Sequence, residues 1–306
     1  MARHASDLAL LAFDDDFKGE VRLNEPMSKH TTYRIGGAVR AFVEVFDLAA
    51  LGRVLDICQR EGLEWFPAGK GSNLLVSDAG FDGVVVVLAG EFRSWTFDGE
   101  TNRVIVGAGT ILSRLVQETF HRGYSGMEFA VGTPGTVGGA VRMNAGTKDD
   151  WIGKRVVSVT TYKAGQGLVR YLASDIDWQA RKTSFAPDEM IVECELQLEP
   201  ALSGNIEGRM RSLLDRRRET QPLDMPSCGS VFRNPDGHSA GALIEGAGLK
   251  GHVHGGAQIS SKHANFIVNT GSATAADVVA LIDLARSEVK KSYGIELTTE
   301  LRFLGF

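Results

Sequence analysis

The chain has 306 residues, of which 43% are hydrophobic and 23% charged, a composition typical of a folded protein of about two domains. Its 33 basic and 38 acidic residues give a formal net charge of −5, which excludes the basic surface of a nucleic-acid-binding protein. No apolar run approaches the roughly 20 residues of a membrane span, and the N-terminus leads into acidic residues rather than a signal peptide. The three scattered cysteines indicate a reducing compartment, so we expect a cytoplasmic protein.

The N-terminal two thirds of the chain predicts mixed helices and strands after a polar lead-in over residues 1–20. Asp47 is expected to cap a helix that Gly62 ends, and Thr110 to cap a second helix that buries Leu112 and Leu115. Apolar and β-branched runs predict the strands, which are residues 42–46, 64–67, 84–88, 103–106, 156–162 and 190–198.

The C-terminal third predicts two longer helices. A boundary is expected near residues 200–205, followed by a basic helix over 206–219 that buries Ile206, Met210, Leu213 and Leu214. Thr274 and Asp277 form a capping-box pattern that opens the second helix, and Gly294 is expected to end it. The elements are segregated rather than strictly alternating, so the predicted fold class is α+β, without an internal repeat.

Glycine is unusually frequent, at 36 of 306 residues, or about 12% where roughly 7% is average. Two loops, at residues 67–75 and 132–146, hold the informative glycines. Loops of this kind let backbone approach a phosphate closely, so together they indicate a shared diphosphate; the alternative is a pair of tight turns. Standard nucleotide motifs fit poorly, because no strand clearly precedes the G-x-G-x-x-G of residues 246–251 and the first loop lacks the spacing of a P-loop.

The remaining polar residues do not by themselves identify a catalytic site. His252 and His254 lack further ligands for a metal, and Cys228 lacks a base, so surface histidines and a packed cysteine are expected. Ser230 is a weak acid unless its acceptor resembles a carbanion, and a turn serine is the alternative. Arg181 and Glu300, taken singly, are surface charges. Composition and spacing thus predict an α+β enzyme with a phosphate-bearing ligand.

Taken together, these motifs resemble the UDP-N-acetylenolpyruvoylglucosamine reductase (MurB) family of peptidoglycan synthesis. The matching stretches occur in the family's order over about residues 24–305, and their combination is specific although each piece alone is not. They are residues 31–37 (TTYRIGG), 69–75 (GKGSNLL), 132–146 (GTPGTVGGAVRMNAG), 226–235 (PSCGSVFRNP), 243–251 (LIEGAGLKG), 261–269 (SKHANFIVN) and the tail around Glu300.

The resemblance implies an NADPH-dependent reductase with non-covalent FAD and a fold like that of vanillyl-alcohol oxidase (PCMH-type). It implies a lead-in over 1–20, FAD-binding subdomains over 21–83 and 84–203, and an α+β substrate-binding domain over 204–306. NADPH and UDP-N-acetylglucosamine enolpyruvate would use one cleft in turn, in a monomer without nucleic-acid, membrane or metal partners. The implied FAD-binding residues are Arg34, Gly36, Gly69, Lys70, Gly71, Ser72, Asn73, Leu74, Gly132, Thr133, Pro134, Gly135, Val137, Gly138, Gly139 and Asn144.

By the same resemblance, Ser230 is the proton donor, and Arg181 with a protonated Glu300 stabilises an enolate-like intermediate. A hydroxyl is a plausible acid here because its acceptor is a carbanion. The implied substrate-binding residues are Arg233, Asn234, Lys262 and Arg302.

The chain departs from the family pattern at three positions. Ala180 replaces the usual tyrosine before the catalytic arginine, Thr183 replaces a serine, and Thr220 replaces a lysine. A phosphate contact is then expected from one of the arginines at 216–218, and the short tail resembles the subgroup that lacks an extra tyrosine loop. Two alternatives are a flavin oxidoreductase with another substrate and a silent nucleotide-sugar sensor. Joint retention of Arg181, Ser230 and Glu300 argues against both.

Overall fold

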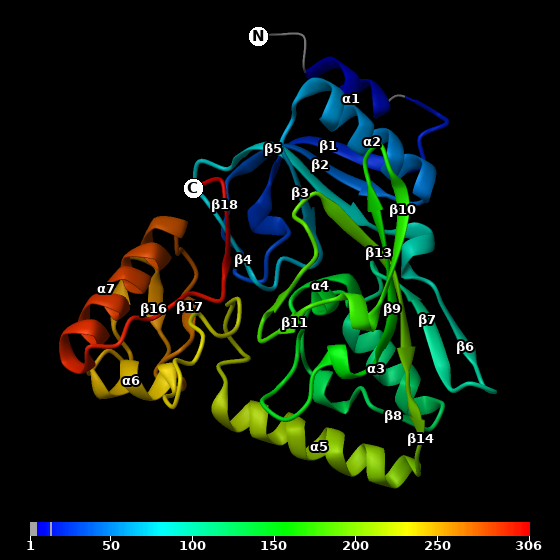
Figure 1. Ribbon diagram of the computed structural model, residues 1–306. Helices are drawn as coiled ribbons and strands as arrows, with labels where there is room; N and C mark the ends of the chain where they lie inside the picture. The colour runs from blue at the N-terminus through cyan, green and yellow to red at the C-terminus, as the bar shows by residue number, and fades with distance from the viewer. Residues whose placement is uncertain (1–4, 13) are drawn as a thin grey trace. The chain divides into compact units, whose positions relative to one another are not determined.

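The structure, a computed structural model, describes residues 5–12 and 14–306 (Figure 1). The chain divides into two units: the first comprises Met1–Asn24, Arg40–Gly69 and Gly83–Leu214, and the second Glu25–Val39, Lys70–Asp82 and Asp215–Phe306. Two N-terminal stretches therefore group with the C-terminal third of the chain. The domain boundaries expected from the sequence, at 20/21, 83/84 and 203/204, stay predictions.

The first unit is built on two main sheets. One has the strand order β1-β2-β5-β3, and the other is an antiparallel sheet of order β10-β9-β13-β7-β6. Small strand pairs, β11–β12 and β14–β8, complete it. The strands are β1 (Gly19–Pro26), β2 (Ala38–Val45), β3 (Trp65–Ala68), β5 (Phe81–Leu88), β6 (Trp95–Asp98), β7 (Arg103–Gly107), β8 (Tyr124–Ser125), β9 (Val156–Lys163), β10 (Gly167–Leu172), β11 (Trp178–Gln179), β12 (Lys182–Thr183), β13 (Glu189–Gln197) and β14 (Glu199–Pro200).

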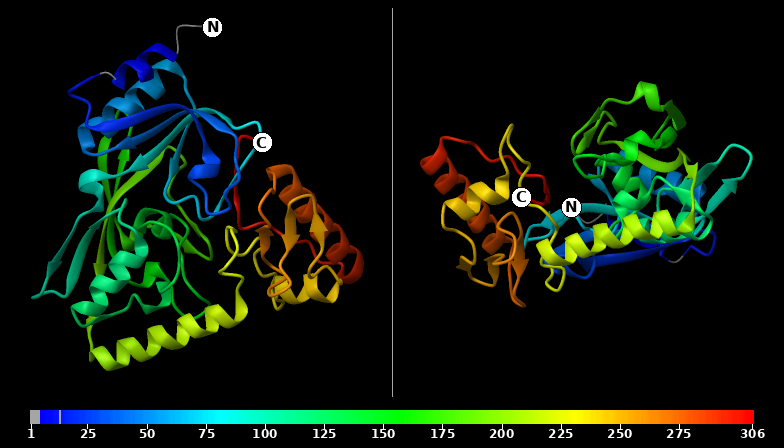
Figure 2. Two further views of the ribbon diagram at one scale, coloured as in Figure 1. Left: turned by 180° about the vertical axis from the view of Figure 1, so that it is seen from behind. Right: turned by 90° about the horizontal axis from the view of Figure 1, so that it is seen from below.

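Helices pack on these sheets or border them, and Figure 2 shows the first unit from behind. Helix α4 contacts both β7 and β13, and α3 contacts β8. The helices are α1 (Ala5–Leu11), α2 (Leu48–Glu61), α3 (Leu112–His121), α4 (Val137–Arg142) and α5 (Ser203–Thr220), which begins in this unit. The short 3₁₀ turns are η2 (Gly90–Arg93), η3 (Glu128–Ala130), η4 (Ile152–Lys154) and η5 (Ala173–Asp175).

Local sequence signals account for much of this unit. The Asp47 side chain accepts from the Ala50 amide at the start of α2, and Gly62 ends that helix at φ 64°, as predicted. The predicted cap at Thr110 is wrong: α3 begins after Ile111 without a side-chain cap, and the buried Thr110 Oγ1 has no hydrogen-bond partner among the described residues. The lead-in also differs from expectation. Residues 5–11 form α1, which buries Leu8, whereas residues 1–4 and 13 lie outside the described residues.

The second unit packs α7 against a three-stranded sheet of order β15-β16-β17, and α6 packs against α7 (Figure 1). A separate parallel pair joins β4 to the last strand, β18. Its elements are η1 (Met27–Lys29), β4 (Leu74–Val76), α6 (Ala240–Gly246), β15 (Val253–His254), β16 (Ala257–Ile259), β17 (Ile267–Asn269), α7 (Ala275–Tyr293) and β18 (Arg302–Leu304). The predicted Thr274–Asp277 capping box and the Gly294 stop, at φ 71°, are both confirmed.

Each unit has its own hydrophobic core. The core of the first unit includes Leu51, Val86 and Leu196, and that of the second includes Tyr33, Phe232 and Leu281. In α5, Ile206 and Met210 are buried as predicted, whereas Leu213 and Leu214 are only half-buried. The predicted α+β class is confirmed. Within residues 5–12 and 14–306, no helix combines the length and the apolar character needed to cross a membrane.

Candidate functional site

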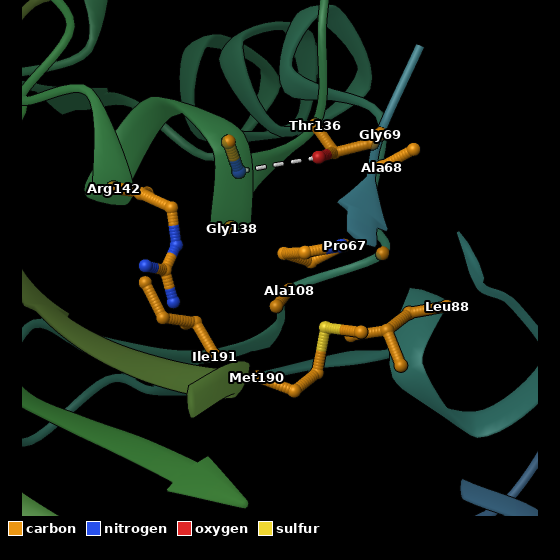
Figure 3. Close-up of a pocket in the computed structure, with 12 residues that line it drawn as sticks. Pro67, Ala68, Gly69, Leu88, Ala108, Thr136, Gly138, Arg142, Met190 and Ile191 are labelled. Atoms are coloured by element: carbon orange, nitrogen blue, oxygen red, sulfur yellow. Dashed lines mark hydrogen bonds between the residues drawn. The ribbon is translucent and has the colours of Figure 1, made fainter. Parts of the chain in front are cut away.

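A pocket in the first unit brings together the two glycine loops that the sequence singles out (Figure 3). Gly69 comes from the loop after β3, and Thr136, Gly138 and Gly139 come from the loop that leads into α4. These segments are almost 70 residues apart in the chain, and only the packing of the unit makes them neighbours. The other lining residues are Pro67, Ala68, Leu88, Ala108, Gly109, Arg142, Met190 and Ile191.

Two of the glycines in this pocket are required because neighbouring side chains pack directly against them. A Cβ on Gly69 would lie 2.6 Å from Thr136 Oγ1, and a Cβ on Gly138 would lie 2.8 Å from the Ala108 Cβ. Neither distance occurs between real atoms in contact, so a side chain at either position forces the loops apart. The glycines thus allow the segments that line the pocket to pack closely against each other.

The first turn of α4 is already partly hydrogen-bonded. The Val137 amide donates to Thr110 O at 2.9 Å, the Gly138 amide to Ala108 O at 2.8 Å, and the Gly139 amide to Thr136 Oγ1 at 3.3 Å. Sequence reasoning expected these residues to offer their amides to a phosphate. These three amides already donate to acceptors within the protein. The glycines of this turn therefore matter more for close packing of the backbone than as free hydrogen-bond donors.

Arg142 is the cation of the pocket, and sequence reasoning did not single it out. Its guanidinium lines the pocket, donates to Ala186 O at 3.1 Å and to the carbonyl of Glu189, and lies 5.9 Å from the Phe185 ring centroid. Figure 3 shows it beside Ile191. The sequence feature that could have identified Arg142 is its position as the basic residue in the last turn of the short helix after the glycine loop.

Met190 and Ile191 reach the pocket because β13 is irregular. The register against β9 shifts between Ile191 and Glu193, which leaves Val192 as an extra residue, and the Val192 carbonyl accepts from the Ala108 amide at 2.8 Å. Such a bulge re-aims side chains at the edge of a site. A continuous apolar run carries no sign of it, so these wall residues were missed.

Asn144 and the loop before α4 adopt conformations that restrict the backbone. Gly132 and Gly135 have φ of 69° and 130°, with Thr133 and Pro134 between them, and Asn144 has φ 41°. The Asn144 side chain is 6% exposed, donates to Gln179 O at 3.0 Å and accepts from the Gly153 amide at 3.2 Å. Its polar atoms therefore bind the protein's own backbone.

Arg181 also belongs to the first unit, in the two-residue turn between β11 and β12. The strands pair Trp178 with Thr183 and Gln179 with Lys182, which leaves Ala180 and Arg181 as the turn. Arg181 has φ 59° and is half-buried. A positive φ is unusual for arginine and marks a backbone held by its surroundings.

In the second unit, Ser230 and Glu300 lie on neighbouring antiparallel segments although 70 residues separate them. The Glu300 amide donates to Val231 O at 2.7 Å, the Arg233 amide donates to Thr298 O at 2.9 Å, and Phe232 forms a bridge with Thr299. Both Ser230 and Glu300 are half-buried. The structure thus places these two predicted catalytic residues on a pair of segments that backbone hydrogen bonds hold together.

The segment that holds Lys70, Gly71, Ser72, Asn73 and Leu74 lies beside this pair of segments. Asn73 Nδ2 donates to Glu300 O at 3.1 Å, and the Arg302 amide donates to Asn73 O at 3.0 Å. Gly71 has φ 58°, and a Cβ there would lie 2.3 Å from His30 O, so glycine is required. The predicted cofactor residue Asn73 and the C-terminal segment that carries Glu300 are thus joined by hydrogen bonds.

Arg34 and Gly36 lie elsewhere in the second unit. Gly36 has φ 133° and packs against Val76, and Arg34 is exposed at φ 58°. Arg34 lines a polar pocket with the segment between α5 and Ser230 and with the end of β17. The other lining residues are Asp224, Met225, Pro226, Asn269, Thr270 and Gly271.

The predicted substrate residues are mostly exposed. Arg233 and Arg302 are exposed, and Asn234 Oδ1 accepts from the Ala240 amide at 3.0 Å, at the start of α6. Lys262 Nζ donates to the carbonyl of Arg218 at the end of α5. Lys262 therefore lies next to the arginine run from which a replacement for the lysine at Thr220 was expected.

Three expectations about unused motifs are confirmed. Cys228 is buried, its thiol donates to Leu74 O at 3.5 Å, and burial raises its pKa well above the usual range. The G-x-G-x-x-G of residues 246–251 follows a helix, α6, and precedes the strand β15, so it lacks the context of a dinucleotide motif. His252 and His254 are exposed, as expected for surface histidines.

Comparison with known proteins gives one consistent result. Residues 221–304 match the family described as UDP-N-acetylenolpyruvoylglucosamine reductase, C-terminal domain, and residues 39–170 match an FAD binding domain. The chain is 44% identical over 288 residues to UDP-N-acetylenolpyruvoylglucosamine reductase 2 of Symbiobacterium thermophilum, covering 94% of this chain and 93% of that one. It is 42% identical to the reductase of Heliobacterium modesticaldum, covering 95% and 92%. The crystal structure of the MurB reductase from Thermus caldophilus superposes with a TM-score of 0.82 at 35% identity, covering 94% and 99%.

Proposed function

The chain belongs to the UDP-N-acetylenolpyruvoylglucosamine reductase (MurB) family, and from this premise we propose which of its residues carry out the reaction. The enzyme is an FAD-dependent oxidoreductase, also called UDP-N-acetylmuramate dehydrogenase. With NADPH it reduces the enolpyruvyl group of UDP-N-acetylglucosamine enolpyruvate, which yields UDP-N-acetylmuramate for peptidoglycan. Its fold is of the vanillyl-alcohol-oxidase (PCMH) type.

The lining of the pocket in the first unit suits part of a flavin dinucleotide, and this is the observation that carries the proposal. Gly69 and Gly138 leave no room for a Cβ, Arg142 supplies a positive charge, and Met190 and Ile191 supply an apolar wall. A dinucleotide needs both close backbone approach to its phosphates and an apolar surface for its ring system. FAD held by these residues would supply hydride transfer from NADPH to the methylene carbon of the enolpyruvyl group.

We assign the proton transfer to Ser230. Addition of a hydride to the methylene carbon leaves an electron pair and negative charge on the neighbouring carbon, conjugated with its carboxylate. The Ser230 hydroxyl donates its proton to that carbon, which completes the reduction. Gly229, at φ 80°, shapes the turn that presents this serine, and the adjacent segment that carries Glu300 supports it.

We assign Arg181 and Glu300 to the negative charge that develops before the proton arrives. The guanidinium of Arg181 pairs with the carboxylate of the substrate, and a protonated Glu300 donates a hydrogen bond to the same enolate-like group. A charged Glu300 would repel it, so the assignment requires the neutral form.

The remaining assignments come from the family pattern. The cofactor residues of the second unit, among them Arg34 and Lys70, are proposed to contact FAD, and Lys262 and Arg302 to contact the sugar nucleotide. The unpaired cysteines support a reducing cytoplasm. The monomeric state and membership in the subgroup without the extra tyrosine loop stay predictions from the sequence.

Flavin spectroscopy of the purified protein tests this function. The protein should show flavin absorbance, NADPH should bleach it anaerobically, and UDP-N-acetylglucosamine enolpyruvate should restore it. Absence of flavin would contradict the whole proposal. Bleaching by NADPH without recovery on addition of the enolpyruvyl compound would contradict only the identity of the substrate.

Ser230→Ala tests the proton donor. Flavin reduction by NADPH should keep its rate, and reoxidation by the enolpyruvyl substrate should slow by roughly 10²- to 10⁴-fold, the usual contribution of a general acid. Stopped-flow absorbance measures the two half-reactions separately. Ser287→Ala, on the exposed face of α7, is the matched control and should change neither. Equal loss of both half-reactions in Ser230→Ala would contradict the role.

A further inference from the structure

The hairpin that presents Arg181 is too short, and its turn too strained, to keep this conformation without contacts from other parts of the unit. The β11–β12 hairpin has only two residue pairs, Trp178 with Thr183 and Gln179 with Lys182. Arg181 lies at φ 59°, a region in which a non-glycine residue costs roughly 1–3 kcal/mol unless surrounding structure holds it. Contacts from outside the hairpin must therefore maintain the turn.

The first contact is made by Thr183, the residue that ends the hairpin. Its side chain is 7% exposed, and its hydroxyl donates to the carbonyl of Arg142 at 2.8 Å. Arg142 is the last residue of α4, the helix whose first turn lines the glycine pocket. The bond ties the outgoing strand of the hairpin to that helix.

The second contact is made by Asn144, just beyond the same helix. Its Nδ2 donates to Gln179 O at 3.0 Å, and its Oδ1 accepts from the Gly153 amide at 3.2 Å. A Cβ on Gly153 would lie 2.7 Å from the Trp178 ring and 2.9 Å from Asn144 Oδ1, so these groups are closely packed around the glycine. The bond ties the incoming strand of the hairpin to the segment that follows α4.

We propose that Asn144 and Thr183 are positioning residues for Arg181, a role that rests on the proposed function of that arginine. One bond holds each strand, at Gln179 directly before the two-residue turn and at Thr183 two residues after it, so the turn is fixed on both sides to the end of α4. Loss of either bond should displace the guanidinium and leave the flavin pocket intact.

Thr183→Val tests the inference because valine keeps the volume and removes the hydroxyl. Flavin reduction by NADPH should stay within about twofold of the parent rate, and reoxidation by UDP-N-acetylglucosamine enolpyruvate should slow by roughly 10- to 100-fold, the cost of about 1 Å of misplacement. Thr183→Ser keeps the hydroxyl and should restore reoxidation. Thr119→Val is the control: Thr119 is also buried and donates to Val116 O at 2.9 Å, on α3.

A double-mutant cycle separates positioning from general damage. In an Arg181→Ala background, Thr183→Val should cause no further loss, because a residue that acts through Arg181 has nothing left to position. Hydrogen exchange at the amides of residues 178–183 should be faster in Thr183→Val than in the parent protein, with or without substrate.

Asn144→Asp removes the donor to Gln179 O and keeps the acceptor for Gly153, so it should behave like Thr183→Val and carries the test if that variant loses its flavin. Additive losses in the cycle, equal slowing of both half-reactions, or no rescue by Thr183→Ser would overturn the inference. Failure of the proposed function looks different: the unsubstituted enzyme would not be reoxidised by the substrate at all.

Discussion

Gly69 shows how one missing Cβ sets the distance between two loops of the first unit. The atom it would meet, Thr136 Oγ1, accepts a hydrogen bond from the Gly139 amide and caps α4. The hydroxyl cannot move aside without breaking that cap. The glycine, the cap and the shape of the pocket are therefore coupled at a single atom.

Gly69→Ala should weaken FAD binding by about tenfold, or about 1.4 kcal/mol, because the added methyl displaces the Thr136 hydroxyl and parts the loops. Fluorescence titration of the flavin-free protein with FAD measures the dissociation constant. Gly99→Ala is the control, since a Cβ at Gly99 meets no atom within 4 Å. Unchanged affinity in Gly69→Ala would show that the loops can separate without affecting the cofactor.

Backbone conformation singles out residues that the family pattern also names. Among the described residues, those with positive φ that are not glycine are Asn24, Arg34, Asn102, Asn144 and Arg181. Asparagine tolerates this region, but arginine does not favour it. The Arg181 turn is held by contacts from outside its hairpin, and no turn signal in the sequence predicts its conformation.

At the scale of elements, α7 shows one helix start that is held by both local and distant groups. Thr274 Oγ1 accepts from the Asp277 amide at 3.1 Å, and the Asp277 carboxylate accepts from the Thr274 amide at 3.0 Å and from the Gly256 amide at 3.1 Å. Asp78 adds a further cap, accepting from the Ala275 and Ala276 amides at 2.7 Å and 2.9 Å. The local box was predictable, and the distant carboxylate was not.

Asp277→Asn should reduce the pH dependence of stability. Hydrogen bonds from the backbone of Thr274 and Gly256 lower the pKa of Asp277 below its usual value. Its ionised form therefore stabilises the fold above the unfolded pKa of about 3.9, and this contribution is lost as the pH falls through the folded pKa. We expect the variant to lose up to about 1 kcal/mol of unfolding free energy at neutral pH and to show a shallower decline below about pH 4.

Urea unfolding across this pH range provides the measurement. Asp283→Asn serves as the control, because Asp283 lies on the same helix and forms an exposed ion pair with Arg286 at 3.5 Å. Identical pH profiles for the Asp277→Asn variant and the parent protein would refute the assignment.

At the scale of the whole molecule, each unit buries its own cysteines. Cys58 and Cys194 belong to the core of the first unit and Cys228 to that of the second. Burial raises the pKa of Cys58 to about 12, and it also raises the pKa of Cys194 and of Cys228 above the usual thiol range. Thiolate is the reactive form, so both access and ionisation protect these residues.

Native protein should therefore react with a thiol reagent at least about 100-fold more slowly than the same protein in urea. Mass spectrometry of labelled peptides assigns each rate to a cysteine, and the labelling of Cys228 relative to Cys58 and Cys194 tells which unit opens first. A cysteine that reacts in the native protein as fast as in urea would disprove its burial.

The amino-acid sequence by itself determined the features that depend on neighbours in the chain. Helices α2 and α7, with their caps at Asp47 and Thr274 and their glycine stops, follow from side chains within one turn. The apolar strands of the first unit and the importance of the two glycine loops were readable in the same way. Arg181, Ser230 and Glu300 were identified because they match the motifs of the family. Their spacing in the sequence does not by itself explain their chemistry.

Only the tertiary structure decided how these parts meet. The contact between Gly69 and Thr136, the bulge that turns Met190 into the pocket, and the pairing of the Ser230 and Glu300 segments join residues dozens of positions apart. The same holds for the bonds from Thr183 and Asn144 that fix the Arg181 turn. Such contacts depend on strand register and close packing, which arise from the summed fit of a whole core rather than from any local preference.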